Sequence, residues 1–274
     1  MKKSNTEKLS LAQTILRFHA DWKKYHHYVS YTSMAELRSE ISNAYLNWIW
    51  WILEPFCLML VYTIVFGVIF KLKEPYFPVF VMTGITMWRF FSMSLQNSAV
   101  MIRSYRMIIS HVYVPKQMLL LIQLFRFGFK SLFSFLVVIV MMIIYGIKPN
   151  PMMLMLLPGV LLLFLITYSV CCFVVHLGVF IDDMHYIVNV GVTMLMYFTG
   201  VFWSIQDRLP SPWGTIVCRA NPIAFAITIA RDGLLYGKNS FHWIYFIWIA
   251  VSLLLAAIGT RLIYKNENTY AKVI

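Results

Sequence analysis

A long, mostly apolar run at residues 46–70 constrains this chain more than any other feature. Its length fits a tilted helix that crosses a bilayer, for which about 20 apolar residues suffice. The run carries one acid, Glu54, next to Pro55. A charge at membrane depth is tolerated where it faces protein or water rather than lipid. The run therefore predicts a membrane-spanning helix that lines an internal surface. Glu54 has three possible settings: facing a pathway, paired with Arg89 or another cation, or at the cytoplasmic rim.

Five further apolar segments follow. The six predicted spans cover residues 46–70, 77–100, 118–147, 152–181, 185–203 and 241–264. Only 12% of the residues are charged, whereas soluble domains average about 25%. We therefore predict an all-α membrane protein with six transmembrane helices, in which residues 46–264 form the membrane domain.

The segment at residues 1–45 is polar overall but has one apolar helical face. Leu11, Ile15 and Phe18 recur at spacings of four and three, and Lys23 and Lys24 add basic charge. Such a pattern predicts an amphipathic helix that lies in the membrane interface. A soluble helix that packs on a partner is the alternative.

Basic residues indicate the orientation. Lys and Arg are more frequent in residues 1–45, 101–117 and 265–274 than in the loops on the other side. Because cytoplasmic flanks of spans carry the excess of Lys and Arg, we expect both termini to be cytoplasmic, with residues 265–274 as a cytoplasmic tail. The net charge of +12 is spread around apolar runs instead of one soluble face, which argues against a nucleic-acid partner.

The stretch at residues 204–240 is too broken by proline and glycine for a plain span, although residues 216–230 are mostly apolar. Backbone can enter a bilayer without crossing it where protein or water satisfies its polar groups. We expect re-entrant helices here, before the last span. An extracellular loop with a surface helix is the alternative.

Patterns typical of catalysis, metal binding or ATP binding are not found in the sequence. It lacks a phosphate-binding Walker loop, and its four cysteines lack metal-ligand spacing. The acids Asp182 and Asp183 follow the fourth predicted span and form either a solvated turn or a docking site for a basic partner. The loop at residues 101–117 holds a short apolar core before Pro115, which suits either a plain connector or a helix that a soluble partner contacts.

Four motifs in order resemble the permease subunit of type-2 ATP-binding-cassette polysaccharide exporters. Leu53-Glu54-Pro55 after the tryptophans is similar to the family's W-x-x-L-x-P step, and Val112-Tyr113-Val114-Pro115-Lys116 to its (V/I)-Y-F-P-(R/K) coupling segment. Residues 177–183 resemble L-G-x-x-x-R-D. Asn221-Pro222 with Arg231, Leu234 and Gly237 resembles N-P…R…L-x-G. The sequence departs from the pattern at Ile181, where the family commonly has arginine, and at Gly200, where it has proline.

This resemblance implies a bacterial plasma-membrane translocase subunit without catalytic residues of its own. Its partners would be a second copy of the chain, two separate ATPase chains that bind ATP and Mg²⁺, membrane lipids and an undecaprenyl-diphosphate-linked polymer. The chain looks most like the permeases that translocate wall teichoic acid, a step of cell wall biogenesis. O-antigen and capsular polysaccharide permeases are similar, and a drug or small-lipid exporter of the same family is an alternative.

Candidate functional residues fall into three groups. Those expected to couple to the ATPase are Arg106, Ile108, Ile109, His111, Pro115, Asp182 and Asp183. Those expected along the substrate pathway are Trp48, Trp51, Glu54, Tyr62, Trp88, Arg89, Tyr168, Tyr197, Phe198 and Trp203. Those expected to contact the diphosphate are Arg38, Arg126 and Lys130. Aromatic faces suit sugar rings and cations suit phosphates, whereas membrane-interface packing and snorkelling are the alternatives for the aromatic and basic residues, respectively.

Two other classes of protein compete with an exporter. A membrane glycolipid transferase would need an acid or histidine cluster near the membrane surface, for which Asp182, Asp183 and His185 are the candidates. An ion channel is disfavoured because the sequence has no polar ring or filter-like repeat.

Overall fold

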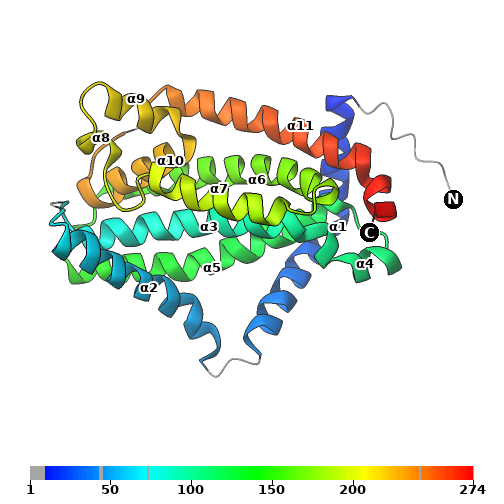
Figure 1. The fold of residues 1–274 in the computed structure, drawn as a ribbon, viewed down its shortest axis with the longest axis horizontal. Helices are drawn as coiled ribbons and strands as arrows, with labels where there is room; N and C mark the ends of the chain where they lie inside the picture. The colour runs from blue at the N-terminus through cyan, green and yellow to red at the C-terminus, as the bar shows by residue number, and fades with distance from the viewer. Residues whose placement is uncertain (1–9, 43–45, 73, 241, 274) are drawn as a thin grey trace.

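The computed structural model describes residues 10–42, 46–72, 74–240 and 242–273, and every regular element in these ranges is a helix. Parts of the predicted interface segment (residues 1–9 and 43–45) and the last residue of the predicted tail lie outside the described residues. The long helices run side by side along the longest dimension of the molecule (Figure 1). They are α2 (Trp50–Tyr62), continued as a π-helix over Thr63–Ile69, α3 (Phe77–Ser104), α5 (Lys116–Ile144), α6 (Leu156–Phe180), α7 (Met184–Phe198) and α11 (Ile244–Val273).

Helix α6 lies at the centre of the bundle, packed against α3, α10 and α11. Two glycines allow these close approaches. A Cβ atom on Gly178 would lie 2.1 Å from the carbonyl oxygen of Ala99 on α3, and one on Gly259 of α11 would lie 2.6 Å from the Cβ of Cys172. Small residues at helix contacts let backbones approach closely, which is how membrane helices gain packing energy where lipid removes the hydrophobic driving force.

Four helices in the described ranges are long and apolar enough to cross a membrane: Trp50–Ile69, Lys116–Ile144, Pro151–Phe180 and Ile244–Tyr270. A fifth candidate is the bent pair Trp213–Ala220 and Pro222–Tyr236, whose axes differ by 106°. Two predicted spans do not meet this standard, because α3 is less apolar and α7 has only 15 residues. Six spans and the orientation of the termini therefore stay predictions.

The polar content of α3 is explained by its position inside the bundle. Most of its side chains are buried. Its hydroxyl groups donate within the helix, for example Thr83 to the carbonyl of Val79 at 2.9 Å and Ser98 to that of Ser94 at 2.7 Å. Such back-bonding satisfies a polar side chain without a partner on another helix. A helix covered by protein can therefore carry more polar residues than one that faces lipid.

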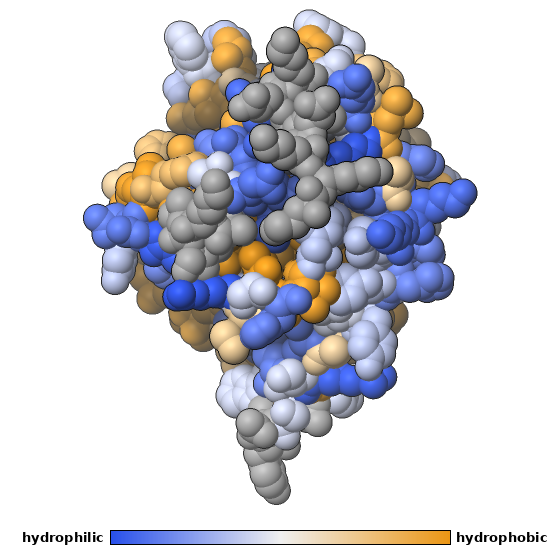
Figure 2. Space-filling model, turned by 90° about the vertical axis from the view of Figure 1, so that its right-hand side faces the viewer, coloured by the Kyte–Doolittle hydropathy of each residue, from blue (hydrophilic) through white to orange (hydrophobic). Residues whose placement is uncertain are grey.

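Two elements lie at the end of the molecule that carries the C-terminus. Helix α1 (Leu11–Ile41) crosses the bundle, packs on α5 and α11, and approaches α2 as one arm of a V (Figure 1). The short helix α4 (Arg106–His111) lies nearby. Figure 2 views this end and shows hydrophilic side chains over much of it, with apolar ones at its edges and near its centre. This surface suits contact with water or with a soluble partner.

The opposite end carries the short helices α8 (Ile205–Arg208), α9 (Trp213–Ala220) and α10 (Pro222–Arg231) (Figure 1). The break between α9 and α10 is encoded locally: the side chain of Asn221 accepts hydrogen bonds from the backbone N–H groups of Ile223 and Ala224, and Pro222 takes the first helical position. Helix α7 ends at Phe198, earlier than the predicted residue 203. Gly200 has φ +67°, a left-handed conformation that ends a helix, and it turns the chain toward α10.

Candidate functional site

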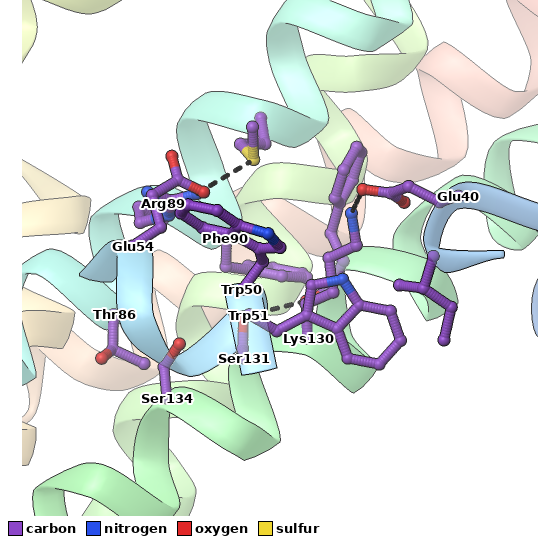
Figure 3. A pocket seen from close by; sticks show the side chains of 13 residues that line it. Glu40, Trp50, Trp51, Glu54, Thr86, Arg89, Phe90, Lys130, Ser131 and Ser134 are labelled. Atoms are coloured by element: carbon purple, nitrogen blue, oxygen red, sulfur yellow. Dashed lines mark hydrogen bonds and ion pairs between the residues drawn. The ribbon is translucent and has the colours of Figure 1, made fainter. Parts of the chain in front are cut away.

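A pocket of about 270 Å³ lies between the C-terminal part of α1 and helices α2, α3 and α5. Its lining combines charged groups, hydroxyl groups and aromatic rings (Figure 3). The lining residues are Glu40, Ile41, Trp50, Trp51, Glu54, Thr86, Arg89, Phe90, Met93, Phe127, Lys130, Ser131 and Ser134. The pocket thus brings together four of the predicted functional residues, Trp51, Glu54, Arg89 and Lys130, which come from three different helices.

Two ion pairs hold the charges of this pocket. Nη2 of Arg89 lies 2.8 Å from Oε2 of Glu54, which answers the question left open for this acid, and Lys130 pairs with Glu40 of α1. The two acids keep 56% and 45% of their side-chain surface exposed, whereas the two cations keep only 22% and 18%. The exposed carboxylates can move away more easily than the cations. An incoming anion can therefore replace them without an uncompensated buried charge.

The ion pairs extend into a ladder between α1 and α5. Glu36 and Glu40 are one helical turn apart on α1, and they pair with Arg126 and Lys130, which are one turn apart on α5. Nη1 of Arg126 lies 2.8 Å from Oε2 of Glu36. Sequence reasoning missed both glutamates, although two acids spaced by four residues facing two cations spaced by four are a recognisable signal.

The ladder also reaches α4. The hydroxyl of Tyr105, the residue before α4, donates to Oε1 of Glu36 at 2.6 Å. Burial, and then the Glu36 carboxylate, raise the pKa of Tyr105 well above its ordinary value, so the hydroxyl remains a donor at any physiological pH. The chain of contacts from Tyr105 through Glu36 to Arg126 connects α4 to the neighbourhood of the pocket.

The predicted pathway aromatics separate into groups. Trp51 packs against Phe129 and Phe133 beside the pocket, and Trp48 packs against Phe133 with 49% of its surface exposed. Further along the bundle, Tyr62 and Tyr197 both contact the ring of Phe202.

The remaining predicted pathway and diphosphate residues lie elsewhere. Phe198 is exposed, whereas Trp88 is buried in the core. Tyr168 is buried too, and its hydroxyl bonds to Gln117 and, at 2.8 Å, to Thr260. Trp203 lines a different cavity at the opposite end, and Arg38 lies exposed on α1. The structure thus does not bring these residues to the pocket.

The predicted coupling residues lie around α4. Arg106 and His111 are exposed on this helix, but Ile108 and Ile109 are half-buried against the core, and Pro115 is buried where α5 begins. Met107 is the apolar side chain that α4 offers to a partner, with 72% of its surface exposed. The sequence placed Met107 in the apolar core of this loop but did not single it out from Ile108 and Ile109, because only the structure shows which face of α4 is covered.

The acids after α6 lie close to the same end. Asp182 pairs with Arg103 of α3, and Asp183 is exposed just before α7. Nε2 of His185 lies 3.0 Å from Nδ2 of Asn189. Asp182 and His185 thus each contact a neighbouring side chain, and Asp183 lies between them.

A second polar network ties the segment before α5 to both chain ends. Nη2 of Arg17 on α1 donates to Oε2 of Glu267 on α11 at 2.7 Å and to the hydroxyl of Tyr113 at 3.2 Å, and Tyr113 also donates to Glu267 at 3.3 Å. Partial burial, and then the Glu267 carboxylate, raise the pKa of Tyr113 to about 12. The segment with Tyr113 therefore connects α4 mechanically to α1 and to α11.

Comparison with known proteins identifies the class of protein to which this arrangement belongs. Residues 31–235 match the family described as ABC-2 type transporter. The chain belongs to this family. It is therefore a multi-pass protein of the bacterial membrane and the permease subunit of an exporter, and the family implies an ATP-binding-cassette partner. The sequence-based recognition of the family is confirmed at this level.

Relatives of the permease match it over most of their length. The O-antigen export system permease protein RfbA of Klebsiella pneumoniae is 22% identical over 240 residues, which cover 87% of this chain and 92% of the relative. RfbA of Myxococcus xanthus is 24% identical over 193 residues, which cover 70% of this chain and 74% of the relative. The family match at residues 31–235 contains the pocket, α4 and the paired short helices α9 and α10.

Proposed function

We propose that this permease moves an undecaprenyl-diphosphate-linked polysaccharide from the cytoplasmic to the outer face of the bacterial membrane, driven by a separate ATPase. Membership of the ABC-2 family supports export, and the names of the relatives favour an O-antigen type of polysaccharide over teichoic acid. The observation that carries the proposal is the pocket between α1, α2, α3 and α5, because it offers cations and aromatic rings together.

The pocket matches the chemistry of a lipid-linked diphosphate. Arg89 can donate a bidentate pair of hydrogen bonds to a phosphate, and Lys130 supplies a compact charge beside it. Trp51 offers an aromatic face, over which Nζ of Lys130 already lies at 5.9 Å. A diphosphate would replace Glu54 and Glu40 as the partners of these cations and so remove one of the two ion pairs in the ladder that holds α1 on α5. Binding of substrate and movement of α1 are thereby linked.

The proposed topology places α1, α4 and both termini on the cytoplasmic side. The excess of Lys and Arg in these segments supports this orientation. Helices α3 and α7 complete six membrane segments, with α3 covered by its neighbours, and the bent pair α9 and α10 enters the outer leaflet and returns. Under this topology the pocket opens near the cytoplasmic side, where the lipid-linked substrate is made.

The proposed assembly contains two copies of the permease and two ATPase chains, which bind ATP and Mg²⁺. The exposed Met107 of α4, framed by Arg106 and His111, is the contact for the ATPase. Closure of the ATPase dimer would push α4, and the contacts of Tyr105 with Glu36 and of Tyr113 with Glu267 would carry that push to α1 and α11. Rigid-body rocking of helices about an interface is a common form of such transitions.

The proposal is tested by ATPase stimulation in the reconstituted complex. An undecaprenyl-diphosphate oligosaccharide should stimulate hydrolysis, and Lys130→Met and Arg89→Met should each raise the half-saturating concentration about tenfold, the loss of roughly 1.4 kcal/mol of a charge-assisted bond. Lys148→Met, an exposed residue between α5 and α6, is the control. Stimulation by a glycerol-phosphate polymer on the same lipid, but not by the oligosaccharide, would instead favour teichoic acid. An unchanged half-saturating concentration in both Lys130→Met and Arg89→Met would exclude this pocket as the diphosphate-binding site.

A further inference from the structure

A second cavity, of about 430 Å³, lies at the end of the molecule opposite α4. Its walls come from the residues that precede α3, from the turn between α7 and α8, and from α10 and the chain that follows it. We call it the outer cup. It is well within the size range of small-molecule sites, roughly 300 to 1,000 Å³. Trp203, which sequence reasoning placed on the pathway, lines the outer cup.

The floor of the outer cup is the guanidinium group of Arg231, which is 4% exposed. Its Nε donates to the carbonyl of Phe80 at 3.1 Å, and Nη1 and Nη2 donate to the carbonyls of Gly200 and Val201 at 2.8 and 2.6 Å. The ring of Phe80 covers the guanidinium plane at 3.5 Å. Arg231 is therefore a structural brace that joins α10, α3 and the turn after α7, and it shapes the cup instead of presenting a free cation.

The lining of the outer cup has balanced charge. Glu74 and Asp232 bring two negative charges, and Arg231 and Lys238 bring two positive charges. Asp232 accepts from the hydroxyl of Ser240, and Nζ of Lys238 lies 5.6 Å from the centre of the Tyr236 ring. Because two carboxylates offset the two cations, the lining has no excess positive charge that would favour a phosphodiester polymer. Acids, amides and hydroxyls together bond well to a ligand rich in hydroxyl groups.

Two aromatic side chains complete the lining of the cup. Trp203 is half-buried in the turn after α7, and Tyr236 is half-buried after α10. Large rings in a polar cavity offer flat apolar faces next to hydrogen-bonding groups. Gln206, an exposed residue of α8, adds an amide whose Nε2 also donates to Sγ of Cys218 at 3.6 Å. Flat faces, neutral polar groups and paired charges make a site for uncharged sugar rings.

We propose that the outer cup binds uncharged sugar units of the exported polymer as they leave the permease. This inference rests on the proposed function, because it takes the cup to face the outer side and the cargo to be a polysaccharide. It adds a binding site and a selectivity: neutral sugars are accepted and phosphate-linked polyols are rejected. The cup would hold the emerging chain and oppose its return between cycles of ATP hydrolysis.

Equilibrium dialysis with the purified complex of permease and ATPase tests the proposal. The probes are labelled neutral oligosaccharides of mannose, of galactose and of N-acetylglucosamine, and an oligomer of glycerol phosphate of similar length. At least one neutral probe should bind, and Trp203→Ala should weaken its binding about tenfold, a loss typical of a well-packed aromatic contact. Gln206→Ala, at an exposed position, should weaken it severalfold even if Trp203→Ala does not fold. Trp213→Ala, exposed at the same end but outside the cup, should bind normally.

Three outcomes would overturn the outer cup as a glycan site: no neutral probe binds, the glycerol phosphate oligomer binds more tightly than every neutral probe, or Trp203→Ala and Gln206→Ala both bind like the unaltered complex. Each leaves the proposed function standing if a lipid-linked polysaccharide is still exported in an ATP-dependent manner. If export of the lipid-linked polysaccharide is absent but a neutral probe binds normally, the proposed function is contradicted, whereas the outer cup remains a glycan-binding site.

Discussion

Arg231 provides the sharpest test of how the outer end of the permease is held together. Replacing Arg231 with methionine removes the donors of three buried carbonyl groups, those of Phe80, Gly200 and Val201. Each buried group left without a partner costs about 1 to 3 kcal/mol. The loss of the contact with the Phe80 ring adds about 2 kcal/mol at a desolvated site. Relief from burying a charge offsets part of this sum, so we expect a net loss of about 3 to 5 kcal/mol, as for other broken buried pairs.

The measurement is reversible unfolding in mixed micelles with a rising fraction of dodecyl sulfate, followed by circular dichroism. Arg231→Met should lower the free energy of unfolding by the amount given above. Arg261→Met on the exposed face of α11 should change it by less than about 0.5 kcal/mol. A loss below about 1 kcal/mol for Arg231→Met would refute the bracing role, because two unsatisfied carbonyls, those of Gly200 and Val201, exceed that value even at the low end of the range.

Gly84 gives an independent check on the same brace. A Cβ atom at this position of α3 would lie 2.1 Å from Nη2 of Arg231 and 2.7 Å from the carbonyl oxygen of Val201. Gly84→Ala should therefore displace the guanidinium group and destabilise the protein. Because both substitutions remove the same bonds, the double variant with Arg231→Met should be less unstable than the sum of the single variants. Additive losses would show that Gly84 acts separately from Arg231.

Three further predictions concern other parts of the permease. Met107→Asp on α4 should reduce the amount of ATPase that co-purifies with the tagged permease at least tenfold, whereas Lys148→Asp at the opposite end should not. Equal recovery with both variants would show that α4 does not contact the ATPase. Tyr105→Phe should leave assembly intact but lower the transport achieved for each ATP hydrolysed, because it breaks the bond to Glu36; an unchanged ratio would contradict the relay. Gly178→Ala should lower the free energy of unfolding by more than about 1 kcal/mol, since overpacking typically costs 1 to 3 kcal/mol. The control Gly191→Ala, which has open space around it, should not lower it. Equal effects of the two substitutions would argue against close packing of α3 on α6.

The sequence predicted an all-helical membrane protein correctly, because long apolar runs have few alternative structures in a membrane. The predicted segment at residues 118–147, for example, is found as the helix Lys116–Ile144. The broken region before the last long helix was also expected, since Asn221-Pro222 encodes a cap and a bend in a local pattern. Local signals of this kind can be interpreted without knowledge of distant contacts.

Other features depend on contacts between distant residues. Which cation meets Glu54 follows from how α2 packs on α3, so the sequence left open whether Glu54 pairs with Arg89 or with another cation. The pairing of Glu36 with Arg126 joins residues far apart in the chain and depends on the angle at which α1 crosses α5. The bracing role of Arg231 was not foreseen, because backbone carbonyls are acceptors that leave no trace in a sequence.

The account as a whole depends on ATP-driven movement of a lipid-linked polysaccharide. The direct measurement reconstitutes the permease with its ATPase in vesicles that contain an undecaprenyl-diphosphate oligosaccharide. A glycosidase trapped on one side then reports which leaflet holds the sugar. We predict that sugar crosses to the side opposite the ATPase only when ATP is hydrolysed, and that Lys130→Met slows this transfer. ATP hydrolysis without movement of the oligosaccharide, alongside movement of an unrelated drug or lipid, would contradict the central claim.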